Sequence, residues 1–174
     1  MPPRLNIAYP ACPLPDSNLF HLYLAWRGPG QKKLTQRLRS LPKPDDVQER
    51  KIRIRRAKSF ISACYFQYKY RVDLPFLTAF HAASILNDED EVDKIFASPE
   101  WNVLEPTQGD ARSAGDLARR LGAVGKFDDE FPIIAAMARR LNRAVATVNP
   151  EKYKAIKHHW SDLDVIDVNL FRFV

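Results

Sequence analysis

The stretch that decides the fold runs from Phe127 to Tyr153, FDDEFPIIAAMARRLNRAVATVNPEKY. Apolar residues recur at helical spacing over 133–141, and Pro132 suits the first turn of a helix, where its missing N–H has no partner to lose. Asn142 is well placed to end this helix. The residues AVATV at 144–148 then predict a short buried strand.

Polar side chains lie at both ends of this helix–strand unit. Asp128, Asp129 and Glu130 directly precede the helix, and Asn149 follows the strand in a turn signal with proline. In open α/β sheets, ligands bind at the carboxyl ends of the strands. We therefore expect these side chains to gather at one edge of a sheet.

The pattern along the chain predicts an α/β protein. Strand patterns alternate with helix patterns after Leu74, which favours three layers, α/β/α, around a short and mostly parallel sheet. Residues 1–73 are basic and predicted to be mostly helical, including a helix over 32–41, as an amino-terminal elaboration of the α/β part at 74–174. A chain of 174 residues is long enough to bury a core, and we expect one domain.

Composition excludes several classes of protein. The sequence has no run of ~18 apolar residues, so no membrane span is expected. The Pro-rich amino terminus lacks the apolar stretch of a secretory signal. Cys12 and Cys64 cannot make a disulfide framework and indicate free thiols in a reducing compartment. We therefore expect a cytoplasmic protein.

Charge is distributed unevenly along the chain. Residues 1–87 carry 15 Lys and Arg and 5 Asp and Glu, whereas residues 88–174 carry 12 and 16. Such asymmetry indicates a polyanionic partner or self-complementary surfaces, as in a homodimer. Nucleic acid is the commoner polyanion, because neutralising phosphates with Lys and Arg supplies affinity for any sequence.

The densest positive charge lies in a segment for which apolar positions such as Ile54, Ala57 and Ile61 predict a helix. Its predicted nucleic-acid-binding residues are Arg50, Lys51, Arg53, Arg55, Arg56 and Lys58. Aromatic residues follow over 60–70, and basic side chains beside aromatic rings suit RNA. The alternative is a solvated helix face above an aromatic core.

Several short segments of the second half of the chain come in an informative order. They are VLEP at 103–106, an Ala- and Leu-rich helix pattern at 114–122, IAAMA at 134–138, ATVN at 146–149 and LDV at 163–165. This series resembles the PIN domain, the metal-dependent ribonuclease fold of many toxins in bacterial toxin–antitoxin pairs. The resemblance covers residues 74–168 and implies Mg²⁺ or Mn²⁺ as cofactor, RNA as substrate, and an antitoxin or other protein as partner.

The resemblance also implies site residues in the first half. In the family, an Asp in an Asp-x-Asn segment after the first strand binds the metal, and Asp16 and Asn18 match that spacing. Asp16 equally suits the N-cap of a helix over 19–26, so both roles stay open. Pro13 and Pro15 make the preceding residues a poor central strand, because proline cannot donate to a ladder.

The sequence departs from the family at two positions. The segment 78–83 has no acid where the family has a metal-binding glutamate, and His81 is either its replacement as ligand or base, or a core histidine. Phe131 aligns with a metal-binding Asp of the family. The acids just before Phe131 take the place of that Asp if a one-residue bulge shifts the register.

The predicted function is a metal-dependent endoribonuclease of PIN type. The predicted catalytic residues are Asp16, Asp128, Asp129, Glu130 and Asn149, with Asp16 and Asp129 as metal ligands. Converging carboxylates hold a hard cation that lowers the pKa of a bound water and offsets the charge that develops on the phosphate. The alternatives are an inactive PIN-like domain that binds RNA or a protein, and a basic helical nucleic-acid-binding accessory protein.

Overall fold

The computed structural model describes residues 9–27, 46–86, 89–122 and 130–171, which leaves the helix expected over 32–41 and the acids Asp128 and Asp129 outside the described residues. The elements, in chain order, are β1 (Leu14–Pro15), α1 (Ser17–Arg27), α3 (Asp46–Gln67), β2 (Val72–Pro75), α4 (Phe76–Leu86), α5 (Glu89–Ala97), β3 (Trp101–Leu104), α6 (Gln108–Arg120), α7 (Glu130–Arg140), β4 (Val145–Thr147), α8 (Glu151–His159), β5 (Val165–Asp167) and the 3₁₀ helix η1 (Val168–Leu170).

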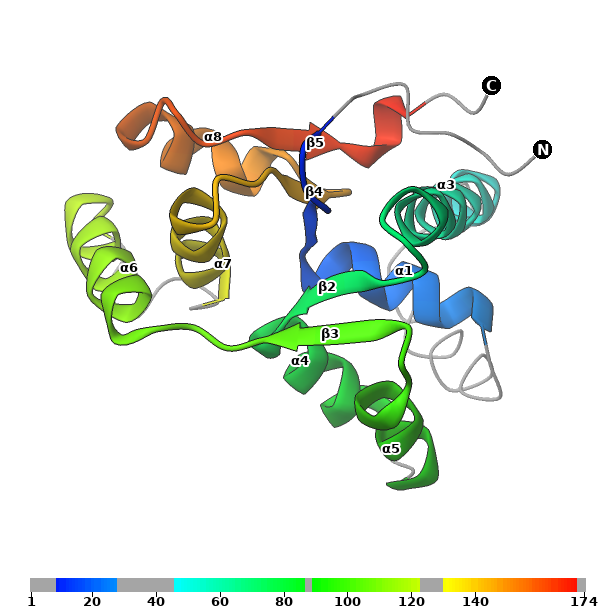
Figure 1. The fold of residues 1–174 in the computed structure, drawn as a ribbon. Helices are drawn as coiled ribbons and strands as arrows, with labels where there is room; N and C mark the ends of the chain where they lie inside the picture. The colour runs from blue at the N-terminus through cyan, green and yellow to red at the C-terminus, as the bar shows by residue number, and fades with distance from the viewer. Residues whose placement is uncertain (1–8, 28–45, 87–88, 123–129, 172–174) are drawn as a thin grey trace.

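The strands form two short sheets in which every pair is parallel. One sheet has the order β1-β4-β5, and the other pairs β2 with β3. β1 also contacts β2, so the two sheets adjoin. Helices pack around the strands, with α1 against α3 on one flank and α6 against α7 on the other (Figure 1). The predicted α/β class is confirmed, and the arrangement is consistent with three layers.

A proline separates the two sheets. Leu14 donates its backbone N–H to Ala144 at 2.8 Å, and Asp16 donates to Ala146 at 3.0 Å, so both N–H groups point to β4. Pro15 lies between them, on the side of β2, and has no N–H to give. These residues were expected to make a poor central strand, and β1 is a two-residue strand at the edge of its sheet, where the missing N–H of Pro15 falls on the side without a ladder.

The unit from α7 to β4 forms as the sequence predicts. α7 ends in left-handed backbone at Asn142, whose φ is 51°. Asn142 donates its N–H to Arg139, and Arg143 donates to Ala138, which is the pair of bonds of a Schellman motif. The buried Ala135 and Ala138 let α7 lie close to β4.

Two elements differ from the sequence analysis. No strand was predicted at residues 72–75, where β2 lies with Val72 and Leu74 buried. Four residues are too few for periodicity to distinguish a strand from a helix end. α8 was not predicted, and its His158 and His159 are exposed.

Buried polar residues locate the candidate site. The described residues that are polar or charged and buried are Asp16, Ser17, Thr78, Asp110, Glu130 and Thr147. Asp110 has a structural explanation, because it completes a capping box with Thr107 and pairs with Arg140 on α7. The other five meet around the end of β1.

Two further expectations concern thiols and membranes. Cys12 and Cys64 are both free, as expected, and both are buried. Across residues 9–27, 46–86, 89–122 and 130–171, every helix is too short or too polar to span a lipid bilayer.

Candidate functional site

Asp16 lies directly after β1 and is fully buried. Its Oδ1 accepts the backbone N–H of Leu19 at 2.9 Å, which is the bond of an N-cap at the start of α1. The cap interpretation is therefore confirmed. Because Asp16 also follows the carboxyl end of a parallel strand, the same carboxylate lies where α/β proteins bind ligands.

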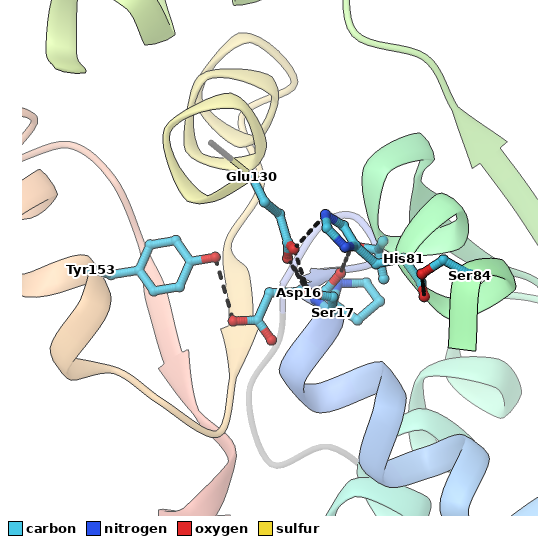
Figure 2. Close-up of polar contacts among 8 residues, drawn as sticks. Asp16, Ser17, His81, Ser84, Glu130 and Tyr153 are labelled. Atoms are coloured by element: carbon cyan, nitrogen blue, oxygen red, sulfur yellow. Dashed lines mark hydrogen bonds and ion pairs between the residues drawn. The ribbon is translucent and has the colours of Figure 1, made fainter. Parts of the chain in front are cut away.

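Glu130 reaches Asp16 from the first turn of α7 and is 4% exposed. Its Oε1 accepts the backbone N–H of Ser17 at 2.9 Å, and the Ser17 hydroxyl also donates to this carboxylate at 2.5 Å (Figure 2). The amino-terminal ends of α1 and α7 thus converge on two carboxylates, and their dipoles stabilise negative charge there.

Two hydroxyl groups hold Asp16 from the side opposite α4. Thr147, the last residue of β4, is buried, and its side chain is hydrogen-bonded to Asp16. Tyr153 of α8 donates its hydroxyl to Asp16 Oδ2 in a long bond of 3.5 Å (Figure 2). Burial, with the charges of Asp16 and Glu130, raises the pKa of Tyr153 well above its ordinary value, so this group stays a neutral donor.

α4 closes the site with Thr78 and His81. Thr78 is buried and donates its hydroxyl to the carbonyl of Pro15 at 3.0 Å, which fixes α4 against the end of β1. His81 Nε2 lies 3.4 Å from Glu130 Oε2, and its side chain is 42% exposed. His81 is therefore not a core histidine. Its ring lies between the buried carboxylate of Glu130 and the protein surface.

The electrostatics of the pair favour a bound cation. Burial, and to a smaller extent the charge of Glu130, raise the pKa of Asp16 to about 7, against the hydrogen bonds from Thr147 and Leu19 and the positive charge of Lys152. Two adjacent carboxylates out of water repel each other unless one is protonated or a cation lies between them. The site can therefore hold a proton or a metal ion.

The donors fit a hard divalent cation. The carboxylates of Asp16 and Glu130 and the hydroxyl of Thr147 offer oxygen atoms, which Mg²⁺ and Mn²⁺ prefer. Each carboxylate has about four acceptor positions, so the bonds from Leu19, Thr147 and Tyr153 leave Asp16 able to bind an ion. No set of three His, Cys, Asp or Glu side chains gathers around a common point within the described residues.

The structure brings together only part of the predicted catalytic set. Asp16 and Glu130 meet, whereas Asp128 and Asp129 lie outside the described residues. Asn149 lies in the turn after β4, where its N–H donates to Thr147 Oγ1 at 2.9 Å. The side chain from this strand end that contacts Asp16 is thus Thr147, two residues before Asn149.

The structure also shows which residue of α7 takes the place of the Asp that the resemblance implies at Phe131. Phe131, which aligns with an Asp of the family, is buried and stacks edge-to-face on Tyr153 with ring centroids 5.5 Å apart. Glu130 is the residue that enters the site, and it does so as the first residue of a regular helix. No bulge is needed to place an acid there.

Sequence reasoning missed Ser17, Thr78, Thr147 and Tyr153 as parts of the site. Ser17 lies inside the Asp16-Asn18 segment, and Thr147 lies at a predicted strand end, so position alone could have indicated both. Thr78 was seen only as a position without an acid. Tyr153 had no signal, because its role depends on an unpredicted helix and on a contact with a residue far away in the chain.

The basic segment forms the helix that was predicted, within α3. Lys51, Arg53 and Arg55 are exposed, and Arg50, Arg56 and Lys58 are partly buried. Arg53 pairs with Glu49 one turn earlier, and Lys58 lies 3.9 Å from the centroid of the Trp26 ring. Lys51 and Arg55, one turn apart, leave a positively charged outer face on α3, whereas Arg53 points to another side of the helix.

The fold and the site together define a class of protein: an α/β protein with two buried carboxylates at the carboxyl end of a parallel strand. No protein-family model matches the chain, and no curated protein matches it. What distinguishes the site is therefore the geometry of Asp16, Glu130 and the residues that hold them.

Proposed function

We propose that this protein is a metal-dependent endoribonuclease of the PIN-like type, with Asp16 and Glu130 as ligands of Mg²⁺ or Mn²⁺. The observation that carries the proposal is the meeting of these two buried carboxylates at the carboxyl end of β1, where the pKa of Asp16 is raised to about 7. A cation there replaces the proton and removes the repulsion between the two charges.

The residues around the pair orient the ligands. Ser17 fixes the Glu130 carboxylate through both its N–H and its hydroxyl, so this side chain does not rotate away when an ion binds. Leu19 fixes Asp16 in the same way through its N–H. Such supporting hydrogen bonds hold metal ligands in place in other proteins.

The remaining groups control water and substrate. The buried Tyr153 covers the carboxylates on the α8 side and keeps bulk water out. His81 lies on the exposed side, where its ring N–H can donate to a phosphate oxygen of an approaching substrate. A bound Mg²⁺ or Mn²⁺ supplies an activated water and offsets charge on the phosphate.

RNA is the proposed substrate because of the charge on the amino-terminal half. Lys51, Arg53 and Arg55 are exposed on α3, in the part of the chain with three times as many basic as acidic residues. A positive face of this kind attracts the phosphate backbone of nucleic acid without regard to sequence.

The test is cleavage of a labelled single-stranded RNA in Mn²⁺, Mg²⁺ or EDTA by the wild type and by the variants Asp16→Asn and Glu130→Gln. The matched control is Glu151→Gln, because Glu151 is also a first-turn acid but is exposed on α8. We expect cleavage with either metal and none in EDTA.

The two site variants should lose at least a hundredfold in rate, since even outer-shell partners of metals cost roughly 10–100-fold. Glu151→Gln should cleave like the wild type. Cleavage that survives both site variants would contradict the carboxylate assignment. RNA binding without any cleavage would instead support the inactive PIN-like alternative.

A further inference from the structure

Two exposed phenylalanine rings lie on α4, one helical turn apart. Phe76 is 38% exposed and Phe80 is 54% exposed. Their rings are nearly parallel, with centroids 6.4 Å apart and an angle of 20° between the planes. Large apolar side chains held together at the surface indicate a binding site more often than isolated ones do.

These rings connect directly to the candidate active site. The Phe80 ring lies edge-on to His81, with centroids 5.8 Å apart. His81 Nε2 in turn lies 3.4 Å from Glu130 Oε2. Two successive contacts therefore lead from the exposed rings to the buried carboxylates, and they start on the side where the site reaches the surface.

Phe66, Tyr70 and Phe96 are also exposed and lack this connection among their described contacts. Phe66, near the end of α3, and Tyr70, in the turn after it, pack edge-to-face on each other at 80°. Phe96, 41% exposed, is on α5. Within the described residues, Phe76 and Phe80 are a pair of exposed, nearly parallel rings that is connected to the site through His81.

The chemistry of this surface suits an unpaired nucleobase. A flat ring face binds any base by stacking, which contributes about 1–3 kcal/mol per base. Bases within a duplex are already stacked on each other and cannot use such a platform. α4 contains no acidic residue, so nothing on this helix repels the phosphates on either side of the base.

We infer that Phe76 and Phe80 form a platform on which a base of single-stranded RNA stacks beside the phosphodiester that is cleaved. This inference rests on the proposed function and specifies its substrate as single-stranded. His81 then lies between the stacked base and the carboxylates, which places the adjoining phosphate near Asp16 and Glu130.

The test measures binding of a fluorescein-labelled single-stranded oligoribonucleotide, and of the same sequence as a duplex, by anisotropy in EDTA so that nothing is cleaved. The variants are Phe80→Ala, Phe76→Ala and Phe80→Trp, and the matched control is Phe96→Ala. We expect Phe80→Ala to weaken single-strand binding by roughly tenfold, as loss of one stacked base implies, and to leave duplex binding unchanged.

Phe80→Trp should keep single-strand binding, because indole also stacks, and its emission should be quenched by the bound base. Phe96→Ala should bind like the wild type. Equal binding of the single strand by Phe80→Ala and by the wild type would overturn the platform. A change of oligomeric state in Phe80→Ala without any change in RNA binding would also overturn it, because the rings would then form a protein interface.

The two proposals fail separately. If the wild type binds single-stranded RNA through Phe80 but does not cleave it with any metal, the platform stands and the nuclease proposal falls. If the wild type cleaves RNA and Phe80→Ala changes neither the Kd nor the KM, the platform falls and the nuclease proposal stands. Absence of RNA binding by the wild type, together with absence of cleavage in Mn²⁺ and Mg²⁺, overturns both.

Discussion

Ser17 donates both its backbone N–H and its hydroxyl to the carboxylate of Glu130. This contact joins the first turn of α1 to the first turn of α7, two helices that are far apart in the sequence. It also holds Glu130 beside Asp16, the N-cap of α1. The candidate site is thus built from helix ends, whose N–H groups favour anions.

Asp16 should make the stability of the metal-free protein depend on pH. Its pKa is raised from 3.8 to about 7 in the folded state, so the folded protein binds a proton that the unfolded chain releases between these values. Stability therefore falls as pH rises from 4 to 7, by up to about 4 kcal/mol, and the full loss is present above pH 7.

Urea unfolding of the wild type and Asp16→Asn in EDTA at a series of pH values measures this effect. Asparagine still accepts the N–H of Leu19, so the helix cap is kept. We expect the variant to be the more stable protein at pH 8 and the two to converge near pH 4. A constant difference at every pH would mean that Asp16 is not protonated in the folded state.

Divalent cations should stabilise the protein through the two carboxylates. An ion at 100 times its Kd adds about 2.7 kcal/mol, which for a chain of this size raises Tm by roughly 5–10 °C. Thermal unfolding with and without Mn²⁺ measures the shift in the wild type, in Glu130→Gln and in Glu151→Gln. The shift should vanish in Glu130→Gln alone, and an equal shift in all three would place the ion elsewhere.

The ion pair between Arg143 and Asp73 should be important for stability. These side chains are 18% and 15% exposed, and Asp73 also accepts from Asn102 at 2.5 Å. The pair joins the segment before β4 to β2 across the boundary between the sheets. Arg143→Ala leaves the Asp73 carboxylate partly buried without its guanidinium, which should cost about 3 kcal/mol in urea unfolding.

Arg119→Ala is the control for that measurement, because Arg119 pairs with Asp116 on the exposed face of α6, at 68% exposure. An exposed pair of this kind is worth less than about 1 kcal/mol. Similar losses in the two variants would show that the partly buried pair has no special role.

The outer face of α3 should contribute sequence-independent affinity for RNA. Lys51 and Arg55 are exposed there. Replacing both with alanine should reduce the slope of log K against log salt by about 1.4, at about 0.7 for each phosphate contact with a single strand. The control replaces Lys154 and Lys157, exposed on α8, and should leave the slope unchanged. Equal slopes in both double variants would place the RNA on another face.

The sequence predicted those helices and strands whose formation depends on residues close to one another in the chain. α7 has a helical apolar period, proline in its first turn and asparagine in left-handed backbone at its end, and each of these was visible. β2 was missed, since its four residues become a strand only by pairing with β3. α8 was missed as well.

Only the acidic residues of the candidate site could be predicted from the sequence. Asp16 was expected from the resemblance to the PIN domain, and Glu130 was one of three candidate acids before α7, of which Asp129 was the predicted metal ligand. Ser17 and Tyr153 could not be assigned roles, since their partners are 113 and 137 positions away in the chain. Phe80 could not be distinguished from a core residue until its exposure was known.

The most direct test of the central claim is anomalous scattering from a crystal of the wild-type protein soaked in Mn²⁺. We predict a peak at coordination distance, about 2.0–2.6 Å, from a carboxylate oxygen of Asp16 and one of Glu130. The same soak of Glu130→Gln should lack it. No peak at these carboxylates, with the metal bound elsewhere or not at all, would contradict the account.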